Sequence, residues 1–153
     1  MKQTTEDDLV IFAVSGGGST LLCLPKGEKT CVDEQNLMRR LFAVGATIHE
    51  INTVRKHISL GRGGQLAKYA YPSRSVSLIF SDVPGNDLGF VASGPTVKDE
   101  TTVKDAKAIL DKYEIWEDRD ERGYGLIETP KDSKYFEKVH NFVLVSNKTA
   151  VEA

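Results

Sequence analysis

The stretch Leu9–Leu22, LVIFAVSGGGSTLL, joins an apolar run to three consecutive glycines. The run Leu9–Val14 is rich in β-branched and aromatic residues, as is typical of a strand buried on both faces. The glycines at 16–18 have no Cβ, so the backbone can approach a ligand closely and adopt positive φ. Ser19 or Thr20 can cap a helix that follows. The stretch therefore predicts a strand, a tight turn and a helix N-terminus.

A turn of this kind favours a bound anion, because N–H groups at a helix N-terminus point toward it. We therefore predict a phosphate-binding turn, with a plain strand-to-helix connection as the alternative. The turn is not a dinucleotide fingerprint, since the third glycine of that motif would fall at Leu21. The Gly-Lys-Ser/Thr of a Walker A loop is also absent.

The composition of the chain limits the kinds of protein that it can be. With 153 residues, 40% of them hydrophobic and 27% charged, the chain has the size and balance of one globular domain. A net charge of -2 favours neither a nucleic acid nor an anionic membrane as partner. The N-terminus is polar and acidic, unlike a signal peptide. Cys23 and Cys31 are too few for a disulfide framework or a zinc site, so we expect separate thiols in a reducing, cytoplasmic setting.

Further strands are predicted at 75–80 and 141–145. Helical patterns occupy 33–48, with Asp33 as N-cap, and 102–113, where Thr102 and Asp105 form a capping-box signal. A shorter helix is expected at 65–71. Strands separated by helices predict an α/β fold, with a Rossmann-like, largely parallel sheet and helices on both faces.

The loops after the strands carry the polar residues of interest. Asp82 and Asp87 follow the second strand, and ligands of open α/β sheets bind at that edge. The two carboxylates could converge on Mg²⁺, or they could serve only as turn and cap residues. The cations of Arg55–His57 precede further glycines, a composition that suits phosphate, or else a solvated face and a flexible link. We expect the loops leaving the strands after Ser15, Ser81 and Ser146 to open onto one shared pocket.

Four segments, taken in order, resemble the glycerate 2-kinase family, which has a large N-terminal α/β domain and a smaller C-terminal MOFRL domain. They are SGGGSTLL at 15–22, GATIHEINTVRKHISLGRGGQLA at 45–67, SLIFSDVPGNDLGFVASGPTVKDETT at 77–102 and LVSNKTAVEA at 144–153. The resemblance implies that residues 1–153 form a single α/β domain from the central part of the large domain. It also implies that an upstream segment and the MOFRL domain are absent, and that the chain is a truncation or a fragment.

The resemblance implies ATP-dependent phosphorylation of D-glycerate to 2-phosphoglycerate, with Mg²⁺. From the chemistry of the matching positions we predict that Lys56, Arg55 and Asp82 are catalytic, with Asp82 as general base, and that Asp82 and Asp87 bind the metal. The remaining substrate- and phosphate-binding positions are Ser15, Gly16, Gly17, Gly18, Ser19, Asn52, Gly63, Gly64, Ser93, Gly94, Thr96 and Asn147. Some relatives carry the name hydroxypyruvate reductase, which the absent dinucleotide fingerprint disfavours.

The chain departs from the family pattern at two positions. Gln65 replaces a usual arginine, which weakens anion binding, and Asn86 replaces an acid, which removes one possible metal ligand. The partial length predicts little activity for the chain alone. Two alternatives follow: a non-catalytic phosphate- or nucleotide-binding module, or half of a split enzyme. In the second case the missing remainder of the kinase, or a second copy of the chain, would complete it.

Overall fold

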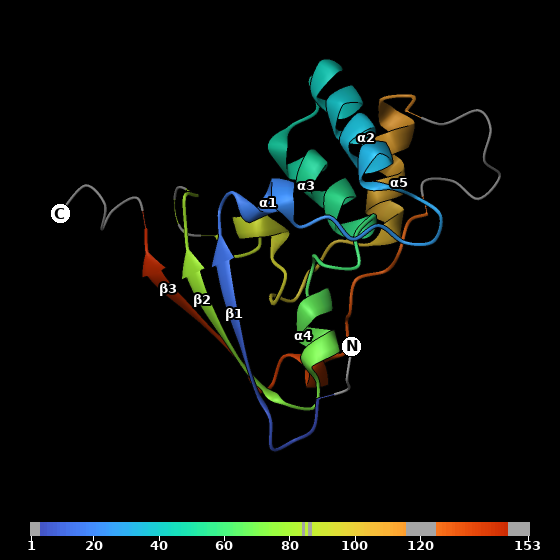
Figure 1. Cartoon of the computed structure of the whole chain (residues 1–153). Helices are drawn as coiled ribbons and strands as arrows, with labels where there is room; N and C mark the ends of the chain where they lie inside the picture. The colour runs from blue at the N-terminus through green and yellow to red at the C-terminus, as the bar shows by residue number, and fades with distance from the viewer. Residues whose placement is uncertain (1–3, 84, 86, 116–124, 147–153) are drawn as a thin grey trace.

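A parallel sheet forms one side of the molecule in a computed structural model, which describes residues 4–83, 85, 87–115 and 125–146. Its three strands lie in the order β1-β2-β3, with β1 at Leu9–Ser15, β2 at Arg74–Phe80 and β3 at Val139–Val145. Ser15 pairs with Phe80, and Phe80 pairs with Val145 across a register shift. The three strands therefore end at the same edge, as Figure 1 shows. The predicted α/β class and parallel pairing are confirmed.

The helices lie in the two crossovers between the strands. The first crossover contains α1 (Gly18–Leu21), α2 (Cys31–Ala43), α3 (Ile48–His57) and α4 (Gln65–Ala70). The second contains the 3₁₀ turn η2 (Val91–Ser93), α5 (Val103–Lys112) and the 3₁₀ turn η3 (Ser133–Tyr135). Within the described ranges no helix is long and apolar enough to span a membrane.

Capping boxes set the starts of the three longest helices. Thr102 caps α5 with Asp105, as predicted. Thr30, rather than Asp33, caps α2, and Asp33 is the third helical residue that returns the hydrogen bond. The single helix predicted over 33–48 is wrong, because Gly45 has a φ of 74° that ends the helix. Thr47 then caps the separate helix α3.

The core has two parts. The larger one lies where α2, α3 and α5 meet, and it includes Leu41, Val54 and Leu110, all with 0% of their surface exposed. The smaller one lies between the sheet and η2, where Val14 and Ile79 pack with Val91 and Ala92. The second cluster seats η2 against the inner face of the sheet, close to the edge where the strands end.

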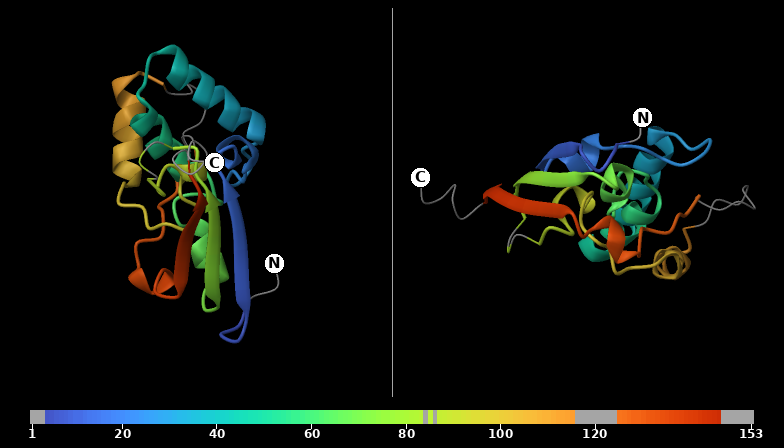
Figure 2. Two further views of the ribbon diagram at one scale, coloured as in Figure 1. Left: turned by 90° about the vertical axis from the view of Figure 1, so that its left-hand side faces the viewer. Right: turned by 90° about the horizontal axis from the view of Figure 1, so that it is seen from below.

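Among the described helices, α4 and the 3₁₀ turn η2 contact the sheet, on the same face. The helices α2, α3 and α5 pack against one another beyond the upper ends of the strands (Figure 1; Figure 2, left). Burial agrees, because Ser75, Ser77 and Ile79 of β2 are buried, whereas Leu9 and Ile11 of β1 are exposed. The expectation of helices on both faces therefore does not hold for this part of the fold.

Cys23 and Cys31 are joined by a disulfide, so the prediction of two separate thiols is wrong. The loop after α1 brings Cys23 back to the first residue of α2, and the two Cα atoms lie 5.8 Å apart. Spacing along the sequence could not show this return, since the loop path decides it. Disulfides are unusual in a reducing cytoplasm.

Candidate functional site

The glycine turn and Asp82 lie against each other at the edge where the strands end. The N–H group of Gly16 donates to the carbonyl of Phe80 at 3.1 Å, which extends the pairing of β1 with β2 by one residue. A Cβ on Gly16 would lie 1.8 Å from Oδ1 of Asp82. Only glycine fits there without moving the carboxylate. The turn after β1 and the loop after β2 thus meet as predicted, although the N–H of Gly16 is used within the sheet and does not face an anion.

Helix α1 begins directly after this turn and is only four residues long. Its N-cap is Gly17, with no side-chain cap. The Thr20 hydroxyl instead donates to the Gly17 carbonyl at 2.8 Å, so the expectation that Thr20 caps the helix is wrong. A Cβ on Gly17 would have nothing within 4 Å, which places this residue beside open space. The first N–H groups of a helix have no partner inside it, so Gly17 and Gly18 carry the donors suited to an anion.

The turn at η2 packs against α1 and has unusual backbone geometry. Ala92, Ser93 and Gly94 all have positive φ, at 50°, 61° and 59°. A Cβ on Gly18 would lie 3.3 Å from the Ala92 Cβ. Ser93 is fully buried, and its Oγ has no hydrogen-bond partner among the described residues. Left-handed backbone at two non-glycine residues costs about 1–2 kcal/mol each, and such strain gathers at functional sites.

Gly63 and Gly64 hold the η2 turn in place. Their N–H groups donate to the carbonyls of Ser93 and Gly94 at 3.0 and 2.8 Å. Both glycines have positive φ, and a Cβ on Gly63 would lie 2.6 Å from Thr129. These N–H groups are therefore used inside the protein. The geometry gives both glycines a packing role and leaves their predicted phosphate contact without a free donor.

Asn52 and Thr96 are also tethers. The Asn52 amide donates to the Gly89 carbonyl at 3.1 Å and fixes the loop before η2. The Thr96 hydroxyl accepts from Ser77 at 2.9 Å and donates to Asn141 at 2.8 Å, which ties the η2 segment to β2 and β3. Both side chains fix the position of the η2 segment through these hydrogen bonds.

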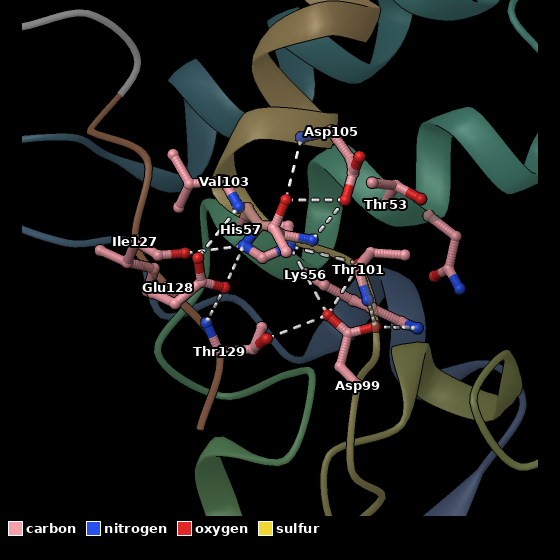
Figure 3. Close-up of polar contacts among 12 residues, drawn as sticks. Thr53, Lys56, His57, Asp99, Thr101, Val103, Asp105, Ile127, Glu128 and Thr129 are labelled. Atoms are coloured by element: carbon pink, nitrogen blue, oxygen red, sulfur yellow. Dashed lines mark hydrogen bonds and ion pairs between the residues drawn. The ribbon is translucent and has the colours of Figure 1, made fainter. Parts of the chain in front are cut away.

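Lys56 lies in a buried polar cluster with Asp99, Thr101 and Thr129 (Figure 3). Its Nζ donates to the Asp99 carboxylate at 3.0 Å, and the Asp99 carboxylate also accepts from the hydroxyl groups of Thr101 and Thr129. Burial opposes ionisation of Asp99, but Lys56 and the Thr101 hydrogen bonds outweigh it and hold the pKa of the carboxyl below its usual value. Asp99 is the residue that sequence reasoning missed. The quoted segment 77–102 contains it, but no local spacing links it to Lys56.

His57 completes the cluster on its far side. Its Nδ1 lies 2.8 Å from the Ile127 carbonyl, so this nitrogen carries a proton and donates. Its Nε2 lies 3.2 Å from the Thr101 hydroxyl. The ring is fully buried, and the Ile127 N–H donates back to the His57 carbonyl at 2.7 Å. These contacts make His57 a structural residue that joins α3 to the loop at 125–130.

Arg55 feels a different charged pair from Lys56, although the two residues are neighbours in α3. Arg62 is fully buried and forms an ion pair with Glu34, and both influence Arg55. Burial lowers the pKa of Arg55, and the charge of Arg62 lowers it further, while Glu34 opposes the change. The prediction that Arg55 and Lys56 act together on one phosphoryl group stays a prediction. Successive residues of a helix point about 100° apart.

The carboxylates predicted to bind metal come from one loop. Asp82 is exposed beside Gly16, and Asp87 Oδ1 accepts from the Gly89 N–H at 2.8 Å. A Cβ on Gly89 would lie 3.1 Å from Asp87 Oδ1 and 3.8 Å from Lys56 Nζ, so these two charged groups flank the same glycine. Among the residues that the structure describes, no group of three His, Cys, Asp or Glu side chains could hold a metal ion. Asn147 lies outside the described residues.

The three strands end at one edge, and the loop after β3 lies outside the described residues. A pocket of about 330 Å³ opens beside the glycine turn, lined mainly by apolar side chains together with Ser15 and Gly18. Asp82 and Ser146 are not among its lining residues. The shared edge of the strands is confirmed. The single pocket stays a prediction, because part of the loops that would line it lies outside the described residues.

Comparison with known protein families matches residues 1–123 to the domain described as "Domain of unknown function (DUF4147)". The chain belongs to the DUF4147 family. This domain is the N-terminal domain of the glycerate 2-kinase family, so the resemblance seen in the sequence is confirmed. This DUF4147 chain spans only about a third of the length of the glycerate kinases that it matches over its whole length.

Three relatives show how much of the kinase this DUF4147 chain covers. A glycerate 2-kinase from Pyrococcus horikoshii is 44% identical over the whole chain, which spans 36% of that protein. A crystal structure of glycerate kinase from Thermotoga maritima superposes with a TM-score of 0.87 at 38% identity, over 98% of this chain and 36% of that one. A protein from Agrobacterium vitis, provisionally named a hydroxypyruvate reductase, is 54% identical over 71% of this chain and 25% of its own length.

Proposed function

We propose that this chain is a substrate-binding segment of a glycerate 2-kinase, which transfers a phosphoryl group from ATP to the 2-hydroxyl group of D-glycerate. The contact between Gly16 and the Asp82 carboxylate is the observation that supports it most directly. It puts helix-start N–H groups and a carboxylate side by side at the strand ends. An anion and its Mg²⁺ need that combination of donors and acceptor.

Phosphoryl transfer depends mostly on positioning and on neutralising negative charge. In this proposal the N–H groups of Gly17 and Gly18 bind a phosphate or the glycerate carboxylate. The Ser93 hydroxyl is a further donor, because it is buried and its Oγ has no hydrogen-bond partner among the described residues. Ser15, Ser19, Gly94 and Asn147 remain proposed contacts through the family resemblance.

Lys56 is the proposed source of positive charge at the transferred phosphoryl group. It is held by Asp99, and it lies near Gly89 and Asp87 at the loop before η2. Asp82 is the proposed general base and, with Asp87, the proposed Mg²⁺ ligand. Because Mg²⁺ commonly uses one or two carboxylates plus phosphate oxygens, two aspartates are enough when the nucleotide is bound.

The complete enzyme needs more polypeptide than this chain contains. The chain spans 36% of the Pyrococcus horikoshii kinase, so we expect it to bind ligand with little turnover alone. The remainder of the large domain and the MOFRL domain would complete the active site. The use of ATP favours a cytoplasmic location for the assembled enzyme, whereas the Cys23–Cys31 disulfide favours an oxidising compartment.

A chimera tests this proposal. The segment of the Pyrococcus horikoshii glycerate 2-kinase that matches this chain is replaced by residues 1–153, and ATP-dependent formation of 2-phosphoglycerate is measured. We expect turnover that requires Mg²⁺, and a loss of about 100-fold in kcat for Lys56→Met. A chimera that has the same Tm as the parent enzyme, and is therefore folded, but forms no product would contradict the proposal.

The isolated chain separates the alternatives. A rise in Tm with ATP-Mg²⁺ or D-glycerate, without turnover, supports a binding segment or module. Turnover that appears only when the rest of the kinase is added supports half of a split enzyme. Oxidation of NADH with hydroxypyruvate would instead favour the reductase name, against the absent dinucleotide fingerprint.

A further inference from the structure

The Cys23–Cys31 disulfide joins the segment after α1 to the first residue of α2. Cys31 is exposed and Cys23 is half-buried, so a reductant in solvent can reach the bond. The use of ATP favours the cytoplasm, where thiols are kept reduced and disulfides are usually transient, catalytic or redox-sensing. An accessible disulfide in such a protein is therefore suited to reversible exchange rather than to permanent cross-linking.

The residue before Cys23 fixes the end of α1. The N–H of Leu22 donates to the Gly18 carbonyl at 2.8 Å, and the Leu22 carbonyl accepts from the guanidinium of Arg62, which is fully buried. A Cβ on Gly61 would lie 3.1 Å from the Leu22 side chain, so this side chain packs closely against the backbone there. The position of Cys23 is therefore coupled to the end of α1 and to the glycine turn before it.

Glu34 of α2 connects this contact to the disulfide. Its Oε1 accepts from Arg62, and its Oε2 lies 3.5 Å from Sγ of Cys23. A disulfide sulfur has no hydrogen to donate, whereas a Cys23 thiol can donate to this carboxylate. Reduction therefore removes the covalent tie between Cys23 and α2, and it also gives the Glu34 carboxylate a second donor beside Arg62.

We propose that Cys23 and Cys31 form a thiol–disulfide exchange site, that its co-reactant is a protein dithiol, and that the disulfide holds the end of α1 in place. A thiolate of the dithiol attacks the exposed sulfur of Cys31, the S–S bond breaks, and Cys23 leaves and takes up a proton. The second thiol of the dithiol loses its proton and displaces Cys31, which takes up a proton in turn. Two electrons thus pass to the chain, and the dithiol becomes a disulfide.

The exchange sets how firmly the end of α1 is ordered. Reduction releases the loop at 23–31, and α1 is four residues long and has no side-chain cap to replace the lost tie. The N–H groups of Gly17 and Gly18, which are the proposed anion donors, must then be ordered by the ligand itself, which weakens binding. Only this effect on the ligand and the cytoplasmic setting rest on the proposed function.

Thiol counting and NMR relaxation test the site on the chain itself. The chain is purified without reductant, incubated with reduced thioredoxin, alkylated and analysed by mass spectrometry. We expect no alkylated cysteine before incubation and two after it, with a fall in Tm of about 5 °C. The backbone order parameters of Gly18 and Leu22 should fall from about 0.85 toward 0.6 on reduction, whereas those of α5 should not change.

The double variant Cys23→Ser/Cys31→Ser removes the bond without a reductant. It should reproduce the Tm and the order parameters of the reduced wild type and should not respond to thioredoxin. Val32→Ser is the matched control, because Val32 follows Cys31 in α2 and is 61% exposed. It should behave as wild type in both redox states. In the chimera, we expect reduction to raise the KM for ATP at least threefold, and the double variant to keep the higher KM in both states.

Each outcome supports the exchange site or removes it. Two free thiols that oxidised glutathione does not pair, or a disulfide that thioredoxin leaves intact in the folded chain, overturns the proposal. Unchanged order at Gly18 and Leu22 after reduction also overturns it, and so does loss of order that includes α5, since the bond would then only support the whole fold. A chimera inactive in both redox states contradicts the proposed function, while the thiol count and the order parameters still decide the exchange site. An active chimera with one KM in both states overturns only the effect on the ligand.

Discussion

Lys56 and Asp99 form a buried ion pair 3.0 Å apart, between residues separated by 43 positions in the chain. The side chains are 11% and 2% exposed. Removing one partner of such a pair leaves a buried charge uncompensated, which costs about 3–5 kcal/mol. The pair therefore positions Lys56 and also stabilises the fold that surrounds it.

We expect Asp99→Asn to lower the free energy of unfolding by about 3 kcal/mol, measured by urea denaturation at pH 7. Because the pKa of Asp99 is held below its usual value, its contribution is present at neutral pH and is lost as acid protonates the folded carboxyl. Glu100→Gln is the control, because Glu100 is 83% exposed and its ion pair with Lys98 is long, at 4.0 Å. Equal stability of both variants would show that the buried pair contributes nothing.

Gly16 and Gly17 are neighbours with opposite tolerance for a side chain. Gly16→Ala puts a Cβ against the exposed carboxylate of Asp82, which must move, so we expect a loss of about 1 kcal/mol in stability and loss of turnover in the chimera. Gly17→Ala meets open space and should change stability by less than about 0.5 kcal/mol. Thermal unfolding of both variants measures the difference. Matching Tm values would mean that Asp82 moves aside freely and that the close contact does not shape the turn.

Substitutions of Ser93 and Thr96 distinguish a role in substrate binding from a role in packing. The buried Ser93 hydroxyl has no hydrogen-bond partner in the described structure, so Ser93→Ala should leave stability within about 0.5 kcal/mol and reduce kcat/KM of the chimera. Thr96→Val removes the bridge between Ser77 and Asn141 and should cost about 1–3 kcal/mol. Unchanged kinetics in Ser93→Ala would remove this hydroxyl from the proposed site.

The ionised Glu50 carboxylate makes part of the free energy of unfolding depend on pH. Lys112 donates to its carboxylate, and the Thr47 N–H and the Tyr113 hydroxyl add hydrogen bonds that together lower the pKa of Glu50 to about 2. A lowered carboxyl pKa stabilises the fold above the unfolded value near 4.5, and this contribution disappears as pH falls toward 2. Glu50→Gln should be less stable by about 1 kcal/mol at pH 7, because Lys112 is exposed and water screens the pair. The gap to wild type should close at pH 2 in a Tm series, and a constant gap would contradict this linkage.

Much of the architecture was predictable because its signals are local. The apolar run of β1, the capping box of Thr102 and Asp105, and the ends of the strands are each set by a few neighbouring residues. The break at Gly45 was visible as a helix stop, yet the apolar spacing across it suggested one helix. Periodicity alone cannot tell one helix from two that share a register.

The sequence by itself determined the parallel α/β framework, the glycine turn at the strand ends and the family of the chain, because each depends on short patterns. Only the tertiary structure decided which groups meet across that framework. It paired Lys56 with Asp99, joined Cys23 to Cys31 and placed Gly16 against Asp82. These contacts join residues from separate loops and helices, and the packing of whole elements, rather than spacing along the chain, brings them within bonding distance.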